Sequence, residues 1–268
     1  GEYQMGPRVL HDHHPYPELS VTDVLVKSSN IGMAKIGERL KNRGLYEATL
    51  KFGFGRPTGI NLPGELSGIL RPLKEWNGYS TGSIPMGHEL AVTPLQLITA
   101  QAALANGGQL ITPRILKGVQ GLGTVTAHSF QASLEDPSLY EPATIVRATV
   151  ASEVARWVIE EPMVRVVSEG TGRRAQIPGY TVFGKTGTAQ KIDPETGGYS
   201  ETLHCSSFIC GAPAHNPRVI VLVVVDEPES GSTHFGGRIA APAAAEILSR
   251  SLMYLRVPPE RETRTARR

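Results

Sequence analysis

The sequence predicts a mixed α+β fold in which helices pack against one antiparallel sheet. Three strand candidates, at 180–185, 206–210 and 218–226, follow one another with no helix between them. That order favours antiparallel pairing over βαβ units. A closing apolar helix at 240–255 ends shortly before a Pro-Pro pair. With 268 residues, 40% of them hydrophobic, the chain can bury a large core.

The first part of the chain is expected to be helical and then rich in turns. Residues 1–20 read as a loop, and short helices at 21–27 and 31–41 follow, with a Ser-Ser-Asn turn between them. Gly44 is expected to cap the second helix in a left-handed conformation. The Gly- and Pro-rich stretch 53–90 predicts turns with short extended pieces.

The clearest helix signal lies in the middle of the chain. Thr93 is the expected N-cap, Pro94 stands in the first turn and Gln96 completes a capping box. The apolar run 95–104 forms the helix, and an Asn-Gly-Gly sequence ends it before a strand at 109–111.

The next segments predict an insertion followed by a bent helix. Residues 118–142 are expected to form a loop insertion and 143–168 a helical stretch. Pro162 must kink or restart this helix, because proline cannot donate an interior hydrogen bond. The expected domain covers residues 1–258, and the polar, arginine-rich residues 259–268 are expected to form a disordered tail.

Composition excludes several classes of function. The formal net charge is only +2, so nothing points to nucleic acid or another polyanionic partner. The longest apolar run, 219–225, suits a buried strand and is far too short to span a membrane. The first residue is Gly1 rather than Met, so we expect the chain to begin inside a longer protein whose earlier part carries any membrane anchor.

Two groups of potential metal ligands are interpreted as structural. Cys205 and Cys210 are five residues apart on a predicted strand and point to opposite faces, so they are expected to be buried free thiols. Together with His204 and His215 they lack the CxxC spacing of zinc sites. The run 11–14 (HDHH) lies in a Pro-rich segment without helical spacing and is expected to be a surface loop. We expect no metal and no cofactor.

Two short motifs carry the residues suited to acyl-transfer chemistry. The first is Ser28-Ser29-Asn30 in a turn, where the Ser28 hydroxyl can relay a proton and Asn30 can orient a substrate amide. The second begins with Lys185 at a strand end, where the amine can hold the electrostatics of that relay.

The rest of the second motif suits binding of an extended substrate. The hydroxyls of Thr186 and Thr188 can bind a carboxylate, and Gly187 lets a substrate lie along the strand edge. The N–H of Thr188 can form half of an oxyanion hole. An S-x-N triplet occurs by chance about once in such a chain, and K-T-G in roughly one chain in twenty. A helix N-cap cluster and a polar hairpin turn are the alternatives for the two motifs.

The stretches around these motifs resemble class B penicillin-binding proteins, in that family's order along nearly the whole chain. The resemblance assigns Ser28 and Asn30 to the family's second motif and Lys185-Thr186-Gly187-Thr188 to its third. The stretches that carry it are 24–40, 52–65, 83–108, 169–191, 218–228 and 235–259. It implies the penicillin-binding transpeptidase or serine β-lactamase-like fold, with its N-terminal part missing.

The sequence departs from the family at the first motif, S-x-x-K, whose Ser is acylated. No Lys in the chain has Ser three residues before it, so the nucleophile is expected upstream of Gly1. The isolated chain is then expected to be inactive, and to fold poorly because its last strands lack their partners. The connection 191–204 is expected to be a hairpin loop at the rim of the site.

The resemblance implies a serine-type peptidoglycan D,D-transpeptidase that cross-links stem peptides and is trapped by β-lactams. It also implies divisome or elongasome partners and a place on the extracytoplasmic face of the bacterial cytoplasmic membrane. A carboxypeptidase or β-lactamase-like hydrolase, and a non-catalytic truncated remnant, are the alternatives. Both enzyme hypotheses, the transpeptidase and the hydrolase, require Asn30 and Lys185 to face each other across one groove.

Overall fold

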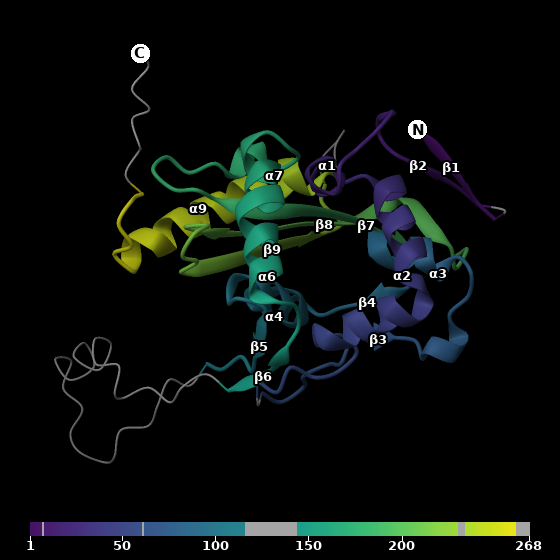
Figure 1. Cartoon of the computed structure of the whole chain (residues 1–268), viewed down its shortest axis with the longest axis horizontal. Helices are drawn as coiled ribbons and strands as arrows, with labels where there is room; N and C mark the ends of the chain where they lie inside the picture. Colours follow the sequence, from purple (N-terminus) through teal and green to yellow (C-terminus); the bar gives the residue numbers. More distant parts are fainter. Residues whose placement is uncertain (7, 61, 116–143, 230–233, 261–268) are drawn as a thin grey trace.

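The structure, a computed structural model, describes residues 1–6, 8–60, 62–115, 144–229 and 234–260 (Figure 1). The elements in chain order are β1 (Glu2–Met5), β2 (Arg8–His11), α1 (Val21–Lys27), α2 (Asn30–Lys51), β3 (Ile69–Leu70), η1 (Leu73–Glu75), α3 (Ser80–Ser83), η2 (Ile84–Met86), β4 (Leu90–Ala91), α4 (Pro94–Ala105), β5 (Gln109–Ile111), β6 (Ile145–Ala148), α6 (Ser152–Val158), η4 (Ile159–Met163), α7 (Val164–Ser168), η5 (Arg173–Ala175), β7 (Phe183–Ile192), β8 (Tyr199–Ala212), β9 (Val219–Asp226), α8 (Gly236–Ile239) and α9 (Ala241–Tyr254).

The largest sheet of the described residues is the antiparallel one that the sequence predicts. Its order is β7–β8–β9, and all pairs run antiparallel. Lys185 lies opposite Ile209 in this register. Because β7 pairs with β8 on one side only, its other edge is left free within the described residues, and the third motif lies on it.

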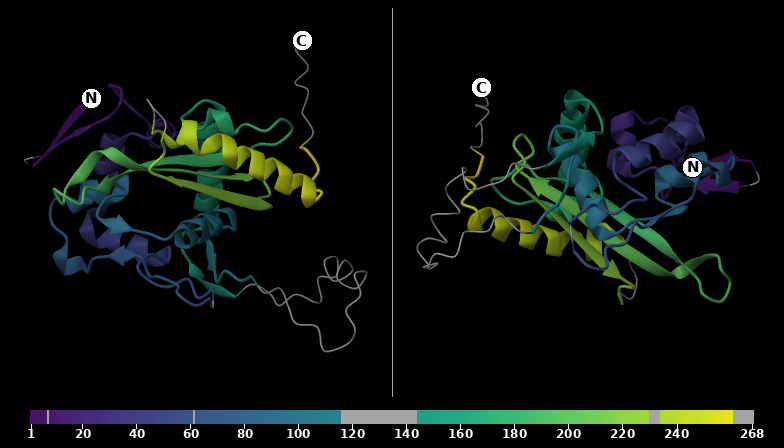
Figure 2. Two further views of the ribbon diagram at one scale, coloured as in Figure 1. Left: turned by 180° about the vertical axis from the view of Figure 1, so that it is seen from behind. Right: turned by 90° about the horizontal axis from the view of Figure 1, so that it is seen from below.

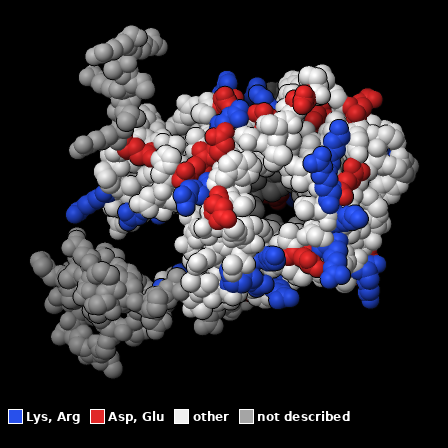
Figure 3. Space-filling view, viewed as in Figure 1, with Lys and Arg blue, Asp and Glu red and all other residues white. Residues whose placement is uncertain are grey.

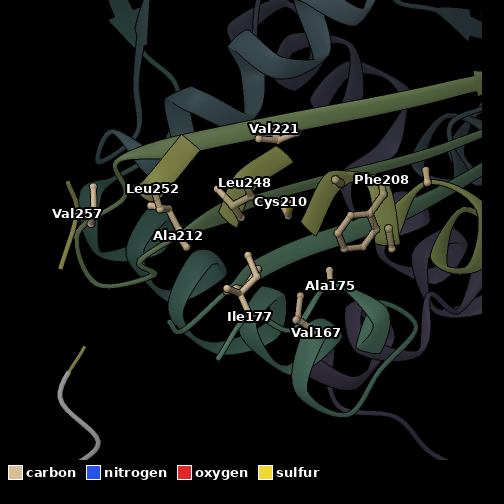
Figure 4. Close-up of a cluster of buried hydrophobic side chains, with 14 residues drawn as sticks. Val167, Ala175, Ile177, Phe208, Cys210, Ala212, Val221, Leu248, Leu252 and Val257 are labelled. Atoms are coloured by element: carbon tan, nitrogen blue, oxygen red, sulfur yellow. The ribbon is translucent and has the colours of Figure 1, made fainter. Parts of the chain in front are cut away.

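One face of the sheet packs against the closing helix. Alternate β8 residues, among them Phe208, Cys210 and Ala212, point to this face and are completely buried. Leu248 and Leu252 of α9 lie over them (Figure 4), and α9 crosses the sheet in Figure 2. The long apolar side chains of α9 therefore fix the sheet that carries the third motif.

The opposite face packs against α4, α6 and the turn of η4. Phe183 of β7, fully buried, meets Ile159 and Met163 there. Pro162 lies inside this turn, which has π-helical hydrogen bonding. The wider turn accommodates the missing N–H of proline, so the predicted perturbation at Pro162 is confirmed.

The second helix is longer than predicted. α2 continues to Lys51, and Gly44 lies within it rather than at a cap. The interruption is at Lys41, whose backbone is non-helical with φ 60°. The loop expected for residues 1–20 contains the β1–β2 hairpin, which single-sequence periodicity missed because each strand has only four residues.

The predicted helix at 95–104 is confirmed together with its start. The Thr93 hydroxyl oxygen accepts a hydrogen bond from the Gln96 N–H. The side-chain oxygen of Gln96 accepts one from the Thr93 N–H, which completes the capping box. β5 also agrees with the prediction. The helical stretch expected from 143 instead begins with β6, which pairs with β5. The insertion predicted at 118–142 lies outside the described residues.

The β7–β8 hairpin is longer than the sequence predicts. β7 extends to Ile192 and β8 starts at Tyr199, so much of the loop expected at 191–204 is strand. The ends of both strands extend beyond the helices that cover the sheet and consist largely of polar residues. They therefore lack the apolar pattern from which a sequence predicts a strand. Both cysteines lie on β8 as free thiols; Cys210 is buried and Cys205 partly buried.

The C-terminal residues that the structure describes contact the domain. The N–H of Glu260 donates to the Gly179 carbonyl, and the Glu260 carboxylate accepts from the Thr181 N–H. The remainder of the expected tail lies outside the described residues. Among those described, none of the helices has the length and apolar character needed to cross a bilayer. No set of three His, Cys, Asp or Glu side chains within the same residues is placed to hold a metal ion.

Candidate active site

Both motifs line one groove of about 990 Å³. The turn between α1 and α2 forms one wall, and the third motif on β7 forms the opposite wall. The helix η2 with Gly87 at its end, and the start of α8, also line the groove. Figure 3 shows a hollow on this face of the molecule, between α2 and the α6–α7 segment.

The turn wall is built from two helix ends that meet. Ser28 ends α1 in a left-handed conformation, with φ 56° and ψ 47°, and its N–H donates back to α1 carbonyls. Ser29 is the N-cap of α2 and accepts from the Gly32 N–H at 2.9 Å. Ser29 is buried, whereas Ser28 and Asn30 are exposed in the groove. The reversal between the helices therefore presents alternate side chains to the groove.

Asp12 locks this turn from outside the motif. Its carboxylate accepts from the Asn30 N–H at 2.6 Å, the Ile31 N–H at 3.1 Å and the Ser29 hydroxyl at 2.5 Å. A carboxylate at the N-terminus of a helix also interacts favourably with the helix dipole. The Asn30 amide donates to the His11 carbonyl at 3.4 Å. Asp12 belongs to the HDHH run at 11–14, in which no local sequence pattern predicts a carboxylate that caps α2.

The two walls touch through a lysine and a serine. Lys185 Nζ donates to Ser28 Oγ at 2.7 Å and to the Thr186 carbonyl at 3.1 Å. Burial of the ammonium within the groove lowers the pKa of Lys185 to about 8. An amine with this pKa can give and take a proton near neutral pH, so the contact between Lys185 and Ser28 is chemically suited to proton transfer.

The threonines of the third motif connect to neighbouring elements. The hydroxyls of Thr186 and Thr171 lie 2.8 Å apart and share a hydrogen bond. The Thr188 hydroxyl accepts from the Gly236 N–H at 3.2 Å. Both threonines line the groove. Their hydroxyls form a polar strip suited to a carboxylate along the free edge of β7.

Two adjacent glycines let α8 approach β7 closely. A Cβ on Gly236 would overlap the carbonyl oxygens of Ser207 and Gly187, and a Cβ on Gly237 would overlap the Thr171 carbonyl. A Cβ on Gly187 would overlap the Ser207 hydroxyl. The strand wall therefore depends on glycine at three positions, of which the sequence singled out only Gly187.

The groove is strongly basic. The described residues that line it include no Asp or Glu. Its charged lining consists of Lys27, Arg173, Arg174, Lys185 and Arg238. The rest of the sequence contains more acidic than basic residues, so positive charge is concentrated in the groove. An anionic ligand is favoured there.

The structure brings together every residue that the sequence nominated, including Ser28, Asn30 and the Lys185–Thr188 run. It adds residues that sequence reasoning missed: Asp12, Thr171 and the Gly236–Gly237 pair. His13, placed by the sequence on a surface loop, lines the groove and packs edge-on against Phe235, with ring centroids 5.1 Å apart.

Comparison with known proteins agrees with this geometry. The model of the penicillin binding protein transpeptidase domain matches residues 3–249. Stage V sporulation protein D of Bacillus subtilis is 39% identical over 239 residues, covering 89% of this chain and 35% of that protein. A probable peptidoglycan D,D-transpeptidase PenA of Neisseria flavescens is 33% identical, over 96% of this chain and 58% of that protein.

Solved structures give the same result. The aztreonam complex of penicillin-binding protein 3 from Mycobacterium tuberculosis superposes with a TM-score of 0.81 at 32% identity, over 97% of this chain and 57% of that one. The transpeptidase domain of Burkholderia pseudomallei penicillin-binding protein 3 gives 0.82 at 32% identity, over 97% and 72%. The chain thus spans between about a third and three fifths of the curated relatives named above.

Proposed function

Since this chain belongs to the penicillin-binding protein transpeptidase family and resembles its class B members, we propose that it forms the substrate-binding and proton-transfer part of a peptidoglycan D,D-transpeptidase. The observation that carries the proposal is the 2.7 Å contact between Lys185 and Ser28 across the groove. This contact joins two motifs that are 157 residues apart in sequence.

Each wall has a separate task in this proposal. The acyl donor, a peptide ending in D-Ala-D-Ala, lies along the free edge of β7 and extends the sheet. Its terminal carboxylate binds the hydroxyls of Thr186 and Thr188, and Asn30 on the turn wall orients the peptide amide. The Thr188 N–H contributes half of the oxyanion hole.

The Lys185–Ser28 pair moves the proton during acyl transfer. When a nucleophilic serine attacks the donor carbonyl, a C–O bond forms and the hydroxyl proton passes to the lysine of the same S-x-x-K motif. The C–N bond to the terminal D-Ala then breaks, and the departing amine needs a proton. Ser28 Oγ lines the groove, accepts a hydrogen bond from Lys185 Nζ at 2.7 Å, and in this proposal passes a proton to the departing amine. With a pKa of about 8, Lys185 is protonated at neutral pH and can replace the proton that Ser28 donates.

The nucleophile is proposed to come from residues outside this sequence, because none of its lysines follows a serine in S-x-x-K. In the full-length protein, the serine would enter the groove beside Ser28 and react with stem peptides or β-lactams. The same proposal places the full-length protein on the extracytoplasmic face of the bacterial cytoplasmic membrane, as part of a division or elongation complex.

Labelling of the full-length protein with fluorescent penicillin tests the proposal. The Lys185→Ala variant is expected to label at least about a hundredfold more slowly than wild type, the usual effect of losing a proton-transfer group. Lys191→Ala is the matched control, because Lys191 lies on the same strand but pairs with Asp226 and Glu227 away from the groove.

Equal labelling of wild type and Lys185→Ala would remove Lys185 from the chemistry. Full-length protein that folds but never labels would favour a non-catalytic remnant. Labelling followed by rapid release to water, with no transfer to an added amine, would favour the hydrolase.

A further inference from the structure

A column of four rings runs from the middle strand of the large sheet to the groove. His204 of β8 is buried and stacks face to face on His234, with ring centroids 3.8 Å apart and planes 8° apart. His234 lies against Phe235 at 4.8 Å, and Phe235 meets His13 edge-on at 5.1 Å. His13 and Phe235 line the groove. We call these four residues the ring column.

The ring column joins the two walls of the groove. His13 is next to Asp12, whose carboxylate caps α2 on the turn wall. Phe235 is the residue before α8, and the N–H of Gly236 donates to the Thr188 hydroxyl of the third motif at 3.2 Å. A change in the stacking of the rings therefore acts on both walls.

Three of the four rings are histidines, so the charge of the column depends on pH. One proton on the stacked pair is tolerated, because the neutral ring can face the cation. Two protons place like charges 3.8 Å apart beside a buried side chain, where little water screens their repulsion. A second proton on the pair therefore forces the two rings apart.

No acidic side chain offsets this charge among the described residues. The acidic side chains on the neighbouring segments are Asp12, Asp226, Glu227 and Glu229. Within the described part of the chain, none of them forms an ion pair with His204 or His234. Asp226 and Glu227 pair with Lys191 instead. The second proton is therefore left uncompensated.

The other titratable neighbours also favour neutral rings. Arg238 on α8 is a cation, and burial raises the pKa of the Cys205 thiol beside His204, which keeps this thiol neutral. Burial of His234, with the charges of His204 and His13, lowers the pKa of His234. Because the folded form favours the neutral ring, the stack is complete above the ordinary histidine pKa of about 6.5 and is lost as the pH falls through the lowered pKa of His234.

We propose that the stacked pair His204–His234 is an acid-sensitive latch, and that its opening at low pH releases Phe235 and the start of α8 from the groove. The only chemistry is proton binding, in which the two imidazole rings take up protons from water. The latch adds regulation to the site. It rests on the proposed function only for its effect on acylation, which slows because Gly236 moves away from Thr188.

Amide hydrogen exchange of the full-length protein, measured by mass spectrometry, tests the latch without any catalytic step. The amides of residues 236 and 238–240 donate to the Thr188 hydroxyl and to the carbonyls of Phe235 and Gly236. After correction for the intrinsic pH dependence of exchange, these amides are expected to exchange about tenfold faster at about pH 5.5 than at about pH 7.5, since one unit of pKa displacement corresponds to a factor of ten.

Two variants separate the latch from other effects of pH. His234→Phe keeps a ring in the stack that cannot be protonated, so its corrected exchange at 236–240 is expected to be equal at both pH values. His215→Phe is the matched control, because His215 is exposed beside Glu160 and outside the groove, and it should keep the acid response of wild type. Penicillin acylation should slow by a larger factor in wild type than in His234→Phe, because the titration of Lys185 is common to both.

If His234→Phe does not fold, hydrogen exchange at the imidazole C2 positions of wild type decides, because it reports the pKa of each histidine separately. The latch predicts two separate protonation steps for His204 and His234, the second well below about 6.5. Two independent steps at the ordinary value would overturn it.

The outcomes also distinguish the latch from the proposed function. An acid response that is absent from wild type, equal in wild type and His234→Phe, or lost in His215→Phe overturns the latch. Protein that labels with penicillin but lacks the acid response overturns the latch alone. Protein that shows the acid response but never labels overturns the proposed function and leaves the latch standing.

Discussion

The two walls of the groove are held in place by different forces. The turn wall at Ser28 and Asn30 depends on side chains, because Asp12 and Ser29 supply its caps. The strand wall at Lys185 depends on the ladder of β7 with β8 and on the close approach of α8. Replacing the single carboxylate of Asp12 removes the cap of the turn wall. The strand wall is displaced only when a larger side chain is introduced where α8 packs on β7.

The two walls also differ in the strain of their backbone. Ser28 has a left-handed conformation that costs a non-glycine residue about 1 kcal/mol. Its N–H contacts with α1 and the cap on the following helix hold it there. The strand wall has no comparable backbone strain at Lys185 or its neighbours on β7. Of the proposed relay pair, Ser28 therefore lies on the strained wall, whereas Lys185 and the proposed substrate-binding edge lie on the relaxed wall.

The largest expected effect comes from breaking the strand wall. Gly236→Ala introduces a Cβ that overlaps the carbonyl oxygens of Ser207 and Gly187. Because these atoms belong to the backbone, α8 must move away, at a cost of about 3 kcal/mol in the free energy of unfolding. The melting temperature of the full-length protein is expected to fall by roughly 5–10 °C in a thermal melt.

Gly78→Ala is the control for Gly236→Ala. A Cβ at Gly78 meets no atom within 4 Å, and its backbone is not left-handed, so the melting temperature should stay within about 1 °C of wild type. Equal melting temperatures for Gly236→Ala and Gly78→Ala would show that α8 does not pack on β7 as described.

A smaller effect is expected from breaking the turn wall. Asp12→Ala removes the acceptor for the Asn30 and Ile31 N–H groups and for the Ser29 hydroxyl. Loss of such a cap costs about 1–2 kcal/mol, which a thermal melt would register as a fall of a few degrees. Asp12→Asn keeps one acceptor and should lie between Asp12→Ala and wild type.

If Asp12→Ala matched wild type in stability and in penicillin labelling, the cap would have no part in holding the turn. The opposite ranking, with Asp12→Ala more damaging than Gly236→Ala, would reverse the comparison between the walls. In that case the side-chain caps, rather than the packing of α8, would dominate the stability of the site.

The sequence was most informative where local chemistry determines structure. The Thr93–Gln96 capping box, α1 and the antiparallel order of the last three strands all follow from short-range signals. The third motif was placed on a strand because apolar residues precede Lys185. Joining the two motifs in one groove required the resemblance to a family, since spacing alone says nothing about residues 157 positions apart.

The rest of the site arises from tertiary contacts that a single sequence does not encode locally. Asp12 acts through space on a helix that begins 18 residues later. The roles of Gly236 and Gly237 depend on which strand and which carbonyl groups they meet in the folded chain. The sequence predicts loop at the ends of β7 and β8, because polar strands beyond the core lack the apolar pattern of a buried strand.

In the proposed function, Ser28 on one wall and Lys185 on the other act as a single proton-transfer unit. The most direct test is a double-mutant cycle in the full-length protein, which measures the penicillin acylation rate of Ser28→Ala, Lys185→Ala and the double variant. A single unit predicts that the double variant is about as slow as the slower single variant. Rate losses that multiply would show instead that Ser28 and Lys185 act independently of each other.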